Sequence, residues 1–154
     1  QEIDIRPSCM QMLRDIGLTP FAKLSGSRGI HIVAPLRRTR PVDEVRAAAQ
    51  VLADRIAAEH PDTLTTARRK EKRDGRILVA VARNTYGQTL VAPYAVRALP
   101  GAPVSAPVTW DEVADPTLTP RAFTVRDMPA RIAAIGDPWA DIAQAAANLK
   151  GLTL

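Results

Sequence analysis

Several kinds of hydrogen-bond donor are concentrated in one short stretch of the chain. Residues 23–35 read Lys-Leu-Ser-Gly-Ser-Arg-Gly-Ile-His-Ile-Val-Ala-Pro, with apolar runs on both sides of a turn that holds Gly26 and Gly29. This composition is typical of a β-hairpin with a bulged connection, whose backbone N–H groups we expect to point outward. Donors arranged in this way can converge on a phosphate group. The side chains that would join them are those of Ser25, Ser27, Arg28 and His31.

The same residues permit a plainer interpretation. The glycines would then serve only the turn, Arg28 would be solvated, and His31 would be a half-buried strand residue. The charge balance favours an acidic partner, because 21 Lys and Arg residues face 16 Asp and Glu residues, for a net charge of +5. A nucleotide or a nucleic acid would meet that description.

The cysteine content and the hydropathy pattern suggest a compartment. Cys9 is the only cysteine, so an internal disulfide cannot form, and a reducing cytoplasm is the expected location. The chain has no signal-peptide pattern and no apolar run long enough to cross a bilayer, so we expect no membrane partner.

The elements that would position the donor-rich stretch begin at the N-terminus. We expect a short strand within residues 1–9, then a helix over Met10–Ile16 that Gly17 closes. The hairpin follows. Residues 41–60 form the clearest helix, because apolar side chains recur there at helical spacing, and His60 is placed to cap its C-terminal end.

A basic run lies in what we expect to be a second short helix over residues 65–73. Most such runs are solvated faces, but this one precedes a predicted strand and could contact a DNA backbone. The residues assigned to that contact are Arg68, Arg69 and Lys70.

The second half of the chain alternates apolar and proline-rich segments. Ile77–Val81 is predicted to be a strand buried on both faces, and Leu90–Arg97 a strand at a sheet edge because it contains Pro93. Residues 100–107 are expected to run extended along the surface without a helix. Further helices are expected from Trp110, over residues 124–135, and from Asp137.

Together these elements predict an α/β fold. A mixed, mostly antiparallel central sheet would be flanked by the helices at 41–60 and 124–135. A chain of 154 residues can bury one core, so we expect a single domain over residues 1–154.

Several landmarks also stand in a characteristic order. They are the hairpin stretch, Arg83-Asn-Thr-Tyr-Gly-Gln-Thr89, Ala92-Pro-Tyr-Ala-Val-Arg97 and Thr109-Trp-Asp-Glu-Val113. This set resembles the polymerase domain of bacterial DNA ligase D, a primase-like member of the archaeo-eukaryotic primase superfamily used in non-homologous end joining. The resemblance covers residues 17–141 and omits the family's N-terminal region. It therefore implies an N-terminally truncated, primase-polymerase-like fold that carries the nucleotide-binding part.

The resemblance also implies ligands and partners. They are a nucleoside triphosphate and DNA ends, with a ligase and other end-joining proteins as further candidates. The residues that match the family's triphosphate contacts are Ser25, Ser27, Arg28, His31 and Arg97.

Catalysis in this family uses Mn²⁺ or Mg²⁺ held by three aspartates, and only one of them has a counterpart here. Asp4 matches the first aspartate, whereas Arg6 and Ala80 occupy the positions of the second and third. A guanidinium repels a cation by several kcal/mol at close range, at an effective dielectric of about 20. We therefore expect no bound metal and an impaired polymerase.

Three hypotheses remain open from the sequence. The chain is a catalytically impaired domain that binds nucleotide or DNA ends, or an active nucleotidyltransferase that uses carboxylates outside this chain, or a non-enzymatic interaction domain. An intact Asp-x-Asp motif upstream would favour the second, and folding without nucleotide binding would favour the third.

Overall fold

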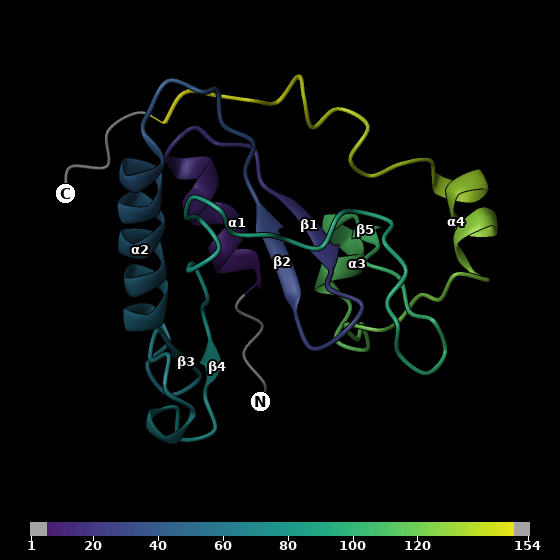
Figure 1. Cartoon of the computed structure of the whole chain (residues 1–154), viewed down its shortest axis with the longest axis horizontal. Coiled ribbons are helices and arrows are strands. Elements are labelled where there is room, and N and C mark those ends of the chain that lie inside the picture. The colour runs from purple at the N-terminus through teal and green to yellow at the C-terminus, as the bar shows by residue number, and fades with distance from the viewer. Residues whose placement is uncertain (1–5, 150–154) are drawn as a thin grey trace.

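The computed structural model describes residues 6–149, and Asp4 lies outside them (Figure 1). In chain order the elements are α1 (Arg6–Asp15), β1 (Phe21–Leu24), β2 (Ile30–Val33), α2 (Val42–Glu59), β3 (Leu64–Thr65), the 3₁₀ helix η1 (Lys70–Lys72), β4 (Ile77–Leu78), β5 (Pro107–Val108), α3 (Trp110–Ala114) and α4 (Met128–Ile135). The described helices include none that is both long enough and apolar enough to cross a bilayer. The predicted mixed α/β class is confirmed.

The predicted hairpin forms the centre of the main sheet. β1 and β2 pair antiparallel, and β5 adds to the other edge of β1, also antiparallel, giving the order β2-β1-β5. Successive residues of β1 face opposite sides of the sheet. Ala22 and Leu24 are buried against Val108 and Val113 on one side, which leaves Lys23 for the other side.

The proline-rich segment is where the prediction of a surface path is wrong. It contains no helix, as expected, but residues 103–108 are all buried. Their backbone groups are paired on two sides, since Ala106 accepts from Leu24 N–H at 2.9 Å and Ser105 N–H donates to Ala95 at 2.9 Å. Val104, Ala106 and Met128 form a second apolar cluster here.

The region between α2 and residue 97 also departs from prediction. Residues 65–73 form no α-helix. Instead β3 pairs parallel with β4, and η1 lies in the connection between them. The strand predicted at Ile77–Val81 is only two residues long and not buried on both faces, because Ile77 is 56% exposed. Residues 90–97 form no regular strand, and only Val96 makes an isolated bridge. The bridge partner belongs to the proline-rich segment, so tertiary pairing replaces the expected edge strand.

Helix α2 was predicted almost residue for residue. It packs against β3 of the small β3–β4 sheet and also contacts α1. His60 is its C-cap residue, as predicted, and its backbone N–H donates to Ile56 at 3.2 Å. The imidazole Nε2 lies 3.2 Å from Ser8 Oγ, which joins α2 to α1.

The boundaries of the terminal helices differ from prediction. α1 begins at Arg6, inside the segment predicted to be a strand, because Pro7 falls in the first helical turn, where no N–H group is needed. Gly17, at φ +79°, ends the helix, as predicted. α4 starts at Met128 instead of 124, because Thr124 N–H and Oγ1 both donate to Asp127 Oδ2 at 2.7 Å and hold a turn there.

The chain after α4 forms a strap across the molecule instead of the predicted last helix. In Figure 1 this trace runs from α4 along the upper edge toward α2. At its start, Trp139 Nε1 donates to the Ala22 carbonyl at 2.9 Å. At its end, Ala147 accepts from Arg37 N–H at 2.9 Å. We refer to residues 137–148 as the C-terminal strap.

Candidate anion-binding site

The turn of the β1–β2 hairpin is organised from inside. Ser25 Oγ is buried and accepts hydrogen bonds from the N–H groups of Ser27, Arg28 and Gly29 at 3.0–3.1 Å. The prediction that the turn aims its N–H groups outward is therefore wrong for these three residues. The serine closes the turn because its hydroxyl occupies the place where an external anion would have sat.

Arg97 also holds this turn in place. Its Nη1 donates to the Ser25 carbonyl at 2.9 Å. Gly26 has a φ of +64°, and a Cβ added to it would lie 2.7 Å from Arg97 Cγ and 3.0 Å from the Val104 carbonyl carbon. Only glycine permits this approach, so the sequence at the turn also sets the position of the arginine.

Lys23 and His31 lie directly opposite each other on β1 and β2, on one face of the sheet. Lys23 is 1% exposed, and its Nζ donates to the Val91 carbonyl and to Ser105 Oγ, both at 2.8 Å. Ser105 Oγ in turn donates to the Leu24 carbonyl at 2.8 Å. His31 is half-buried, and its Nδ1 is shielded from solvent without a protein hydrogen-bond partner.

Lys23, His31 and Arg97 form what we call the cationic cluster. Burial, with a smaller contribution from the nearby Arg97 guanidinium, lowers the pKa of Lys23 to about 8. Burial also lowers the pKa of His31, and Lys23 and Arg97 lower it further. The charged groups that shift these two pKa values are all cationic. An anion placed beside them would relieve the repulsion, which makes the cluster suited to bind one.

The tip of the turn is held by a contact with a residue that is distant in the sequence. Arg121 Nε donates to the Ser27 carbonyl at 3.0 Å. Ser27 is half-buried, whereas the Arg28 side chain is exposed. Of the five predicted phosphate contacts, the structure joins Ser25 to Arg97 directly and places His31 within electrostatic reach of Arg97. Arg28 stands at the rim of the same turn.

The two described positions that the family resemblance assigns to metal ligands, Arg6 and Ala80, carry no carboxylate. Ala80 is exposed and carries a methyl group, and with Arg68 it lines a hollow of about 40 Å³, room for little more than a water molecule. Arg6 starts α1, and Asp4 lies outside the described residues. Within residues 6–149, no three His, Cys, Asp or Glu residues are grouped so that they could hold a metal. Among residues 6–149, the chain therefore offers no grouped carboxylates that could hold a pair of metal ions.

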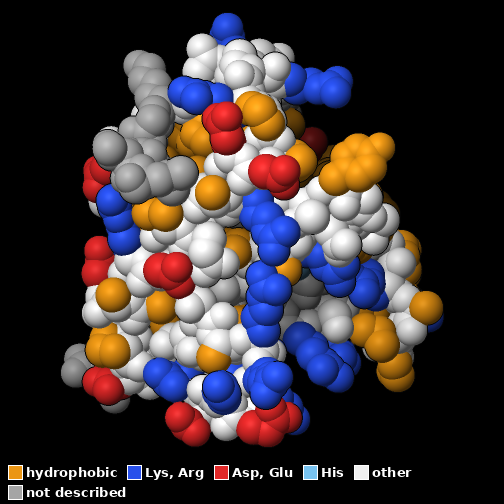
Figure 2. All heavy atoms as spheres, turned by 60° about the vertical axis from the view of Figure 1, so that its left-hand side comes forward, with side chains coloured by type: hydrophobic (Ala, Val, Ile, Leu, Met, Phe, Trp, Pro, Cys, Tyr) orange, Lys and Arg blue, Asp and Glu red, His pale blue; other side chains and the backbone are white. Residues whose placement is uncertain are grey.

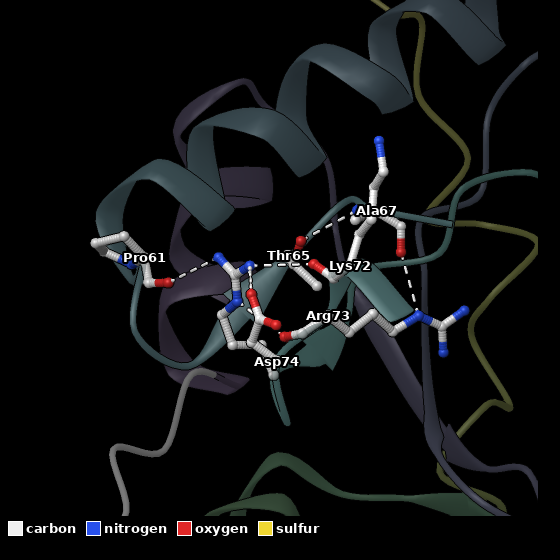
Figure 3. A network of polar contacts seen from close by, with 7 residues as sticks. Pro61, Thr65, Ala67, Lys72, Arg73 and Asp74 are labelled. Carbon is white, nitrogen blue, oxygen red and sulfur yellow. Dashed lines mark hydrogen bonds and ion pairs between the residues drawn. The ribbon is translucent and has the colours of Figure 1, made fainter. Parts of the chain in front are cut away.

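The basic run forms a folded loop between β3 and β4. Arg76 bonds the carbonyls of Pro61, Lys72 and Arg73 at 2.9–3.4 Å and the Asp74 carboxylate at 3.4 Å (Figure 3). Arg73 Nε donates to the Ala67 carbonyl at 3.1 Å. These two arginines are therefore structural.

The other basic side chains of this loop face solvent. Arg68, Arg69 and Lys70, assigned to DNA contact, are all exposed. On the side of the molecule drawn in Figure 2, Lys and Arg side chains form a column down the middle. More of them lie at the lower end, with Asp and Glu among them. We refer to Arg68, Arg69 and Lys70 as the basic loop.

Sequence reasoning missed two members of this site. Lys23 was part of the donor-rich stretch but received no role, although its alternation with Ala22 and Leu24 indicates the opposite face of β1. Arg121 lies 94 residues from its partner Ser27, and no local pattern announces that contact. The first residue could have been found from strand periodicity, the second only from the tertiary structure.

Comparison with known proteins gives a consistent relationship. The family model described as "LigD, primase-polymerase domain" matches residues 4–139. The multifunctional non-homologous end joining protein LigD of Pseudomonas aeruginosa is 36% identical over 136 residues, which are 87% of this chain and 16% of that protein. The bifunctional non-homologous end joining protein LigD of Bacillus subtilis is 31% identical over 85% of this chain and 21% of its own length.

A solved structure agrees in fold. The polymerase domain from Mycobacterium tuberculosis ligase D, in complex with DNA, superposes with a TM-score of 0.85 at 31% identity, covering 92% of this chain and 49% of that one. The chain thus spans about half of that domain and a sixth to a fifth of the two full-length relatives. The matched residues include the hairpin, the cationic cluster and the basic loop, and the chain belongs to the LigD primase-polymerase domain family.

Proposed function

We propose that this chain binds the phosphate groups of a nucleoside triphosphate beneath the β1–β2 turn, without catalysing nucleotidyl transfer. The observation that carries this proposal is the cationic cluster, in which Lys23 and His31 are buried beside Arg97, and burial and the neighbouring cations lower the pKa of both Lys23 and His31. Arg28 at the rim and the hydroxyl of Ser27 complete a donor set for a polyphosphate. Membership of the LigD family supports the choice of a nucleotide.

Calorimetric titration with ATP tests the proposal. In the presence of a chelator we expect binding that Arg28→Ala and Arg97→Ala each weaken at least tenfold, because each removes a charge-assisted hydrogen bond worth about 1.5–3 kcal/mol. Arg38→Ala is the matched control, since Arg38 is also exposed but lies in the loop after β2. Binding that requires Mn²⁺, or that Arg28→Ala leaves unchanged, would contradict a metal-independent phosphate site.

The lack of catalysis has its own test. Ala80 and Arg6 supply no carboxylate, and this supports the proposal that nucleotidyl transfer by a two-metal mechanism is lost. A primer-extension assay with Mn²⁺ should therefore show no product with this chain alone. Extension that depends on Mn²⁺ would show that other carboxylates serve as ligands and would favour the active-enzyme hypothesis.

We also propose that the basic loop contacts a DNA backbone. Its three side chains are exposed, and the solved relative was determined in complex with DNA. The triple variant Arg68→Ala, Arg69→Ala, Lys70→Ala should reduce the salt-dependence slope of DNA binding by up to about 3 units, if each side chain meets one phosphate. Loss of the exposed Arg14, Arg38 and Arg126 removes the same charge and should change the slope less. Equal effects would indicate a general charge effect and no specific loop contact.

A further inference from the structure

Lys23 is a buried ammonium group that ties three segments together. Its Nζ lies 2.8 Å from the Val91 carbonyl and 2.8 Å from Ser105 Oγ, so β1 is joined to the segment that leads to Arg97 and to the buried proline-rich segment. The segment that contains Val91 continues to Arg97, whose guanidinium donates to the Ser25 carbonyl in the β1–β2 turn. The state of the ammonium is therefore coupled to the geometry of the phosphate site.

The titratable groups beside Lys23 are a histidine and an arginine, and neither supplies a negative charge. His31 faces it from β2, and Arg97 approaches from the segment after Val91. The remaining groups around Nζ are a carbonyl and a hydroxyl, which accept hydrogen bonds but carry no charge. Burial beside Arg97 lowers the pKa of Lys23 to about 8, so part of the population is neutral near that pH when no anion is bound.

We propose that Lys23 is a positioning residue that takes up a proton when a polyphosphate binds beneath the β1–β2 turn, which makes the affinity of this site fall in alkaline solution. The inference rests on the proposed phosphate site. The step is a plain acid–base equilibrium, in which the neutral amine gains a proton from solvent and becomes the ammonium. The bound polyphosphate supplies the negative charge that the cluster otherwise lacks, and so favours the protonated form.

Other groups of the site do not titrate in the same range. The pKa of His31 lies below its ordinary value, so the imidazole is neutral at pH 8. A phosphate ester loses its second proton near pH ~6, well below this range. Arginine stays charged throughout. Proton uptake measured near pH 8.5 therefore reports on Lys23.

Calorimetric titration with ATP at pH 8.5, with chelator and in two buffers of different ionisation enthalpy, measures the uptake directly. We expect roughly 0.7 proton per ATP bound, and an affinity that falls about fivefold from pH 8 to pH 9, because these follow by linkage from a free-site pKa near 8. The readout is a proton count, which a purely structural lysine would leave at zero.

Lys23→Arg separates the charge from its titration. Arginine remains protonated, so this variant should bind ATP with no uptake at pH 8.5 and with an affinity that is flat from pH 7 to pH 9. Lys72→Arg, the same change at an exposed lysine, should behave as the wild type does.

Wild-type binding without proton uptake would overturn the inference and leave the proposed phosphate site standing. Uptake that persists in Lys23→Arg would overturn it in the same way, by assigning the proton to another group. If the wild type binds ATP at no pH between 6 and 9, the proposed function is wrong, and this inference is wrong with it. If Lys23→Arg does not fold, the proton count and pH profile of the wild type still decide.

Discussion

Single side chains in this structure act at a distance from their place in the sequence. Gly26 is an example, because its lack of a side chain determines where Arg97 lies, 71 positions further along the chain. Ser25 is another, since its hydroxyl satisfies three backbone N–H groups of the turn. The phosphate-binding capacity that we propose thus depends on residues that need not touch the phosphate.

Gly26→Ala should destabilise the protein by about 2–3 kcal/mol, since it combines a positive φ with a clash against the Val104 backbone. It should also weaken ATP binding, because Arg97 Cγ must move. Gly29→Ala is the control, as a Cβ there would have no heavy atom within 4 Å, and it should change stability by less than about 0.5 kcal/mol. Urea denaturation measures the free energy of unfolding of both variants. Equal effects at the two glycines would show that the close approach at Gly26 is unimportant.

The short elements are held by side chains more than by their own length. α3 has only five residues, but Thr109 and Glu112 form a reciprocal capping box at its N-terminus. Glu112 also pairs with Arg131 of α4, whose guanidinium stacks 4.1 Å from the centre of the Phe123 ring. One carboxylate therefore both caps a helix and connects it to another. Burial raises the pKa of Glu112, but hydrogen bonds from Arg131 and Thr109 outweigh it and hold the pKa below its usual range.

Glu112→Gln should cost about 2 kcal/mol, because it leaves the largely buried Arg131 without a counter-charge while keeping a residue suited to the cap. In the wild type the stabilisation by Glu112 is complete above the ordinary pKa of a glutamate and is lost as the pH falls through the lowered one. The difference in unfolding free energy between wild type and variant should therefore shrink below about pH 4. Glu71→Gln, at an exposed site in η1, is the control and should change little. A difference that stays constant with pH would contradict the ion pair.

At the scale of the whole molecule, extended segments and the C-terminal strap contribute to the core together with residues of α2, α3 and α4. Tyr94 OH donates to Asp137, and burial together with this bond raises the pKa of the phenol. Trp139 packs edge-on against Phe21 with ring centroids 6.2 Å apart. The strap thus contacts the same hairpin in which we propose the phosphate site.

Trp139→Ala should destabilise the whole chain by about 3 kcal/mol, since the indole is 9% exposed and its hydrogen bond to Ala22 is also lost. Ile135→Ala is a suitable control, because Ile135 is 50% exposed on α4. Circular dichroism during denaturation compares the two. A small effect of Trp139→Ala would mean that the strap is dispensable for folding.

The sequence was sufficient for features that are encoded locally. The hairpin, α2 with its His60 cap, the Gly17 helix end and the start of α3 each follow from periodicity or capping chemistry. The buried course of residues 103–108 could not be foreseen, because prolines usually mark surface segments and the pairing partners are distant in sequence. In the candidate site, the turn residues were predictable, whereas the Lys23 bonds to Val91 and Ser105 depend on tertiary contacts.

The C-terminal strap is fastened at both ends and lightly held between them. Trp139 secures one end to β1, and the parallel bridge between Leu36 and Ala147 secures the other beside α2. A cut between these anchors would leave the C-terminal piece attached to the rest of the molecule only through its contacts with the loop after β2. Those contacts include the hydrogen bonds of Arg37 N–H to the Ala147 carbonyl and of Arg37 Nε to the Ala146 carbonyl. The share of that piece retained on a native gel would therefore measure how strongly the second anchor holds without the covalent link.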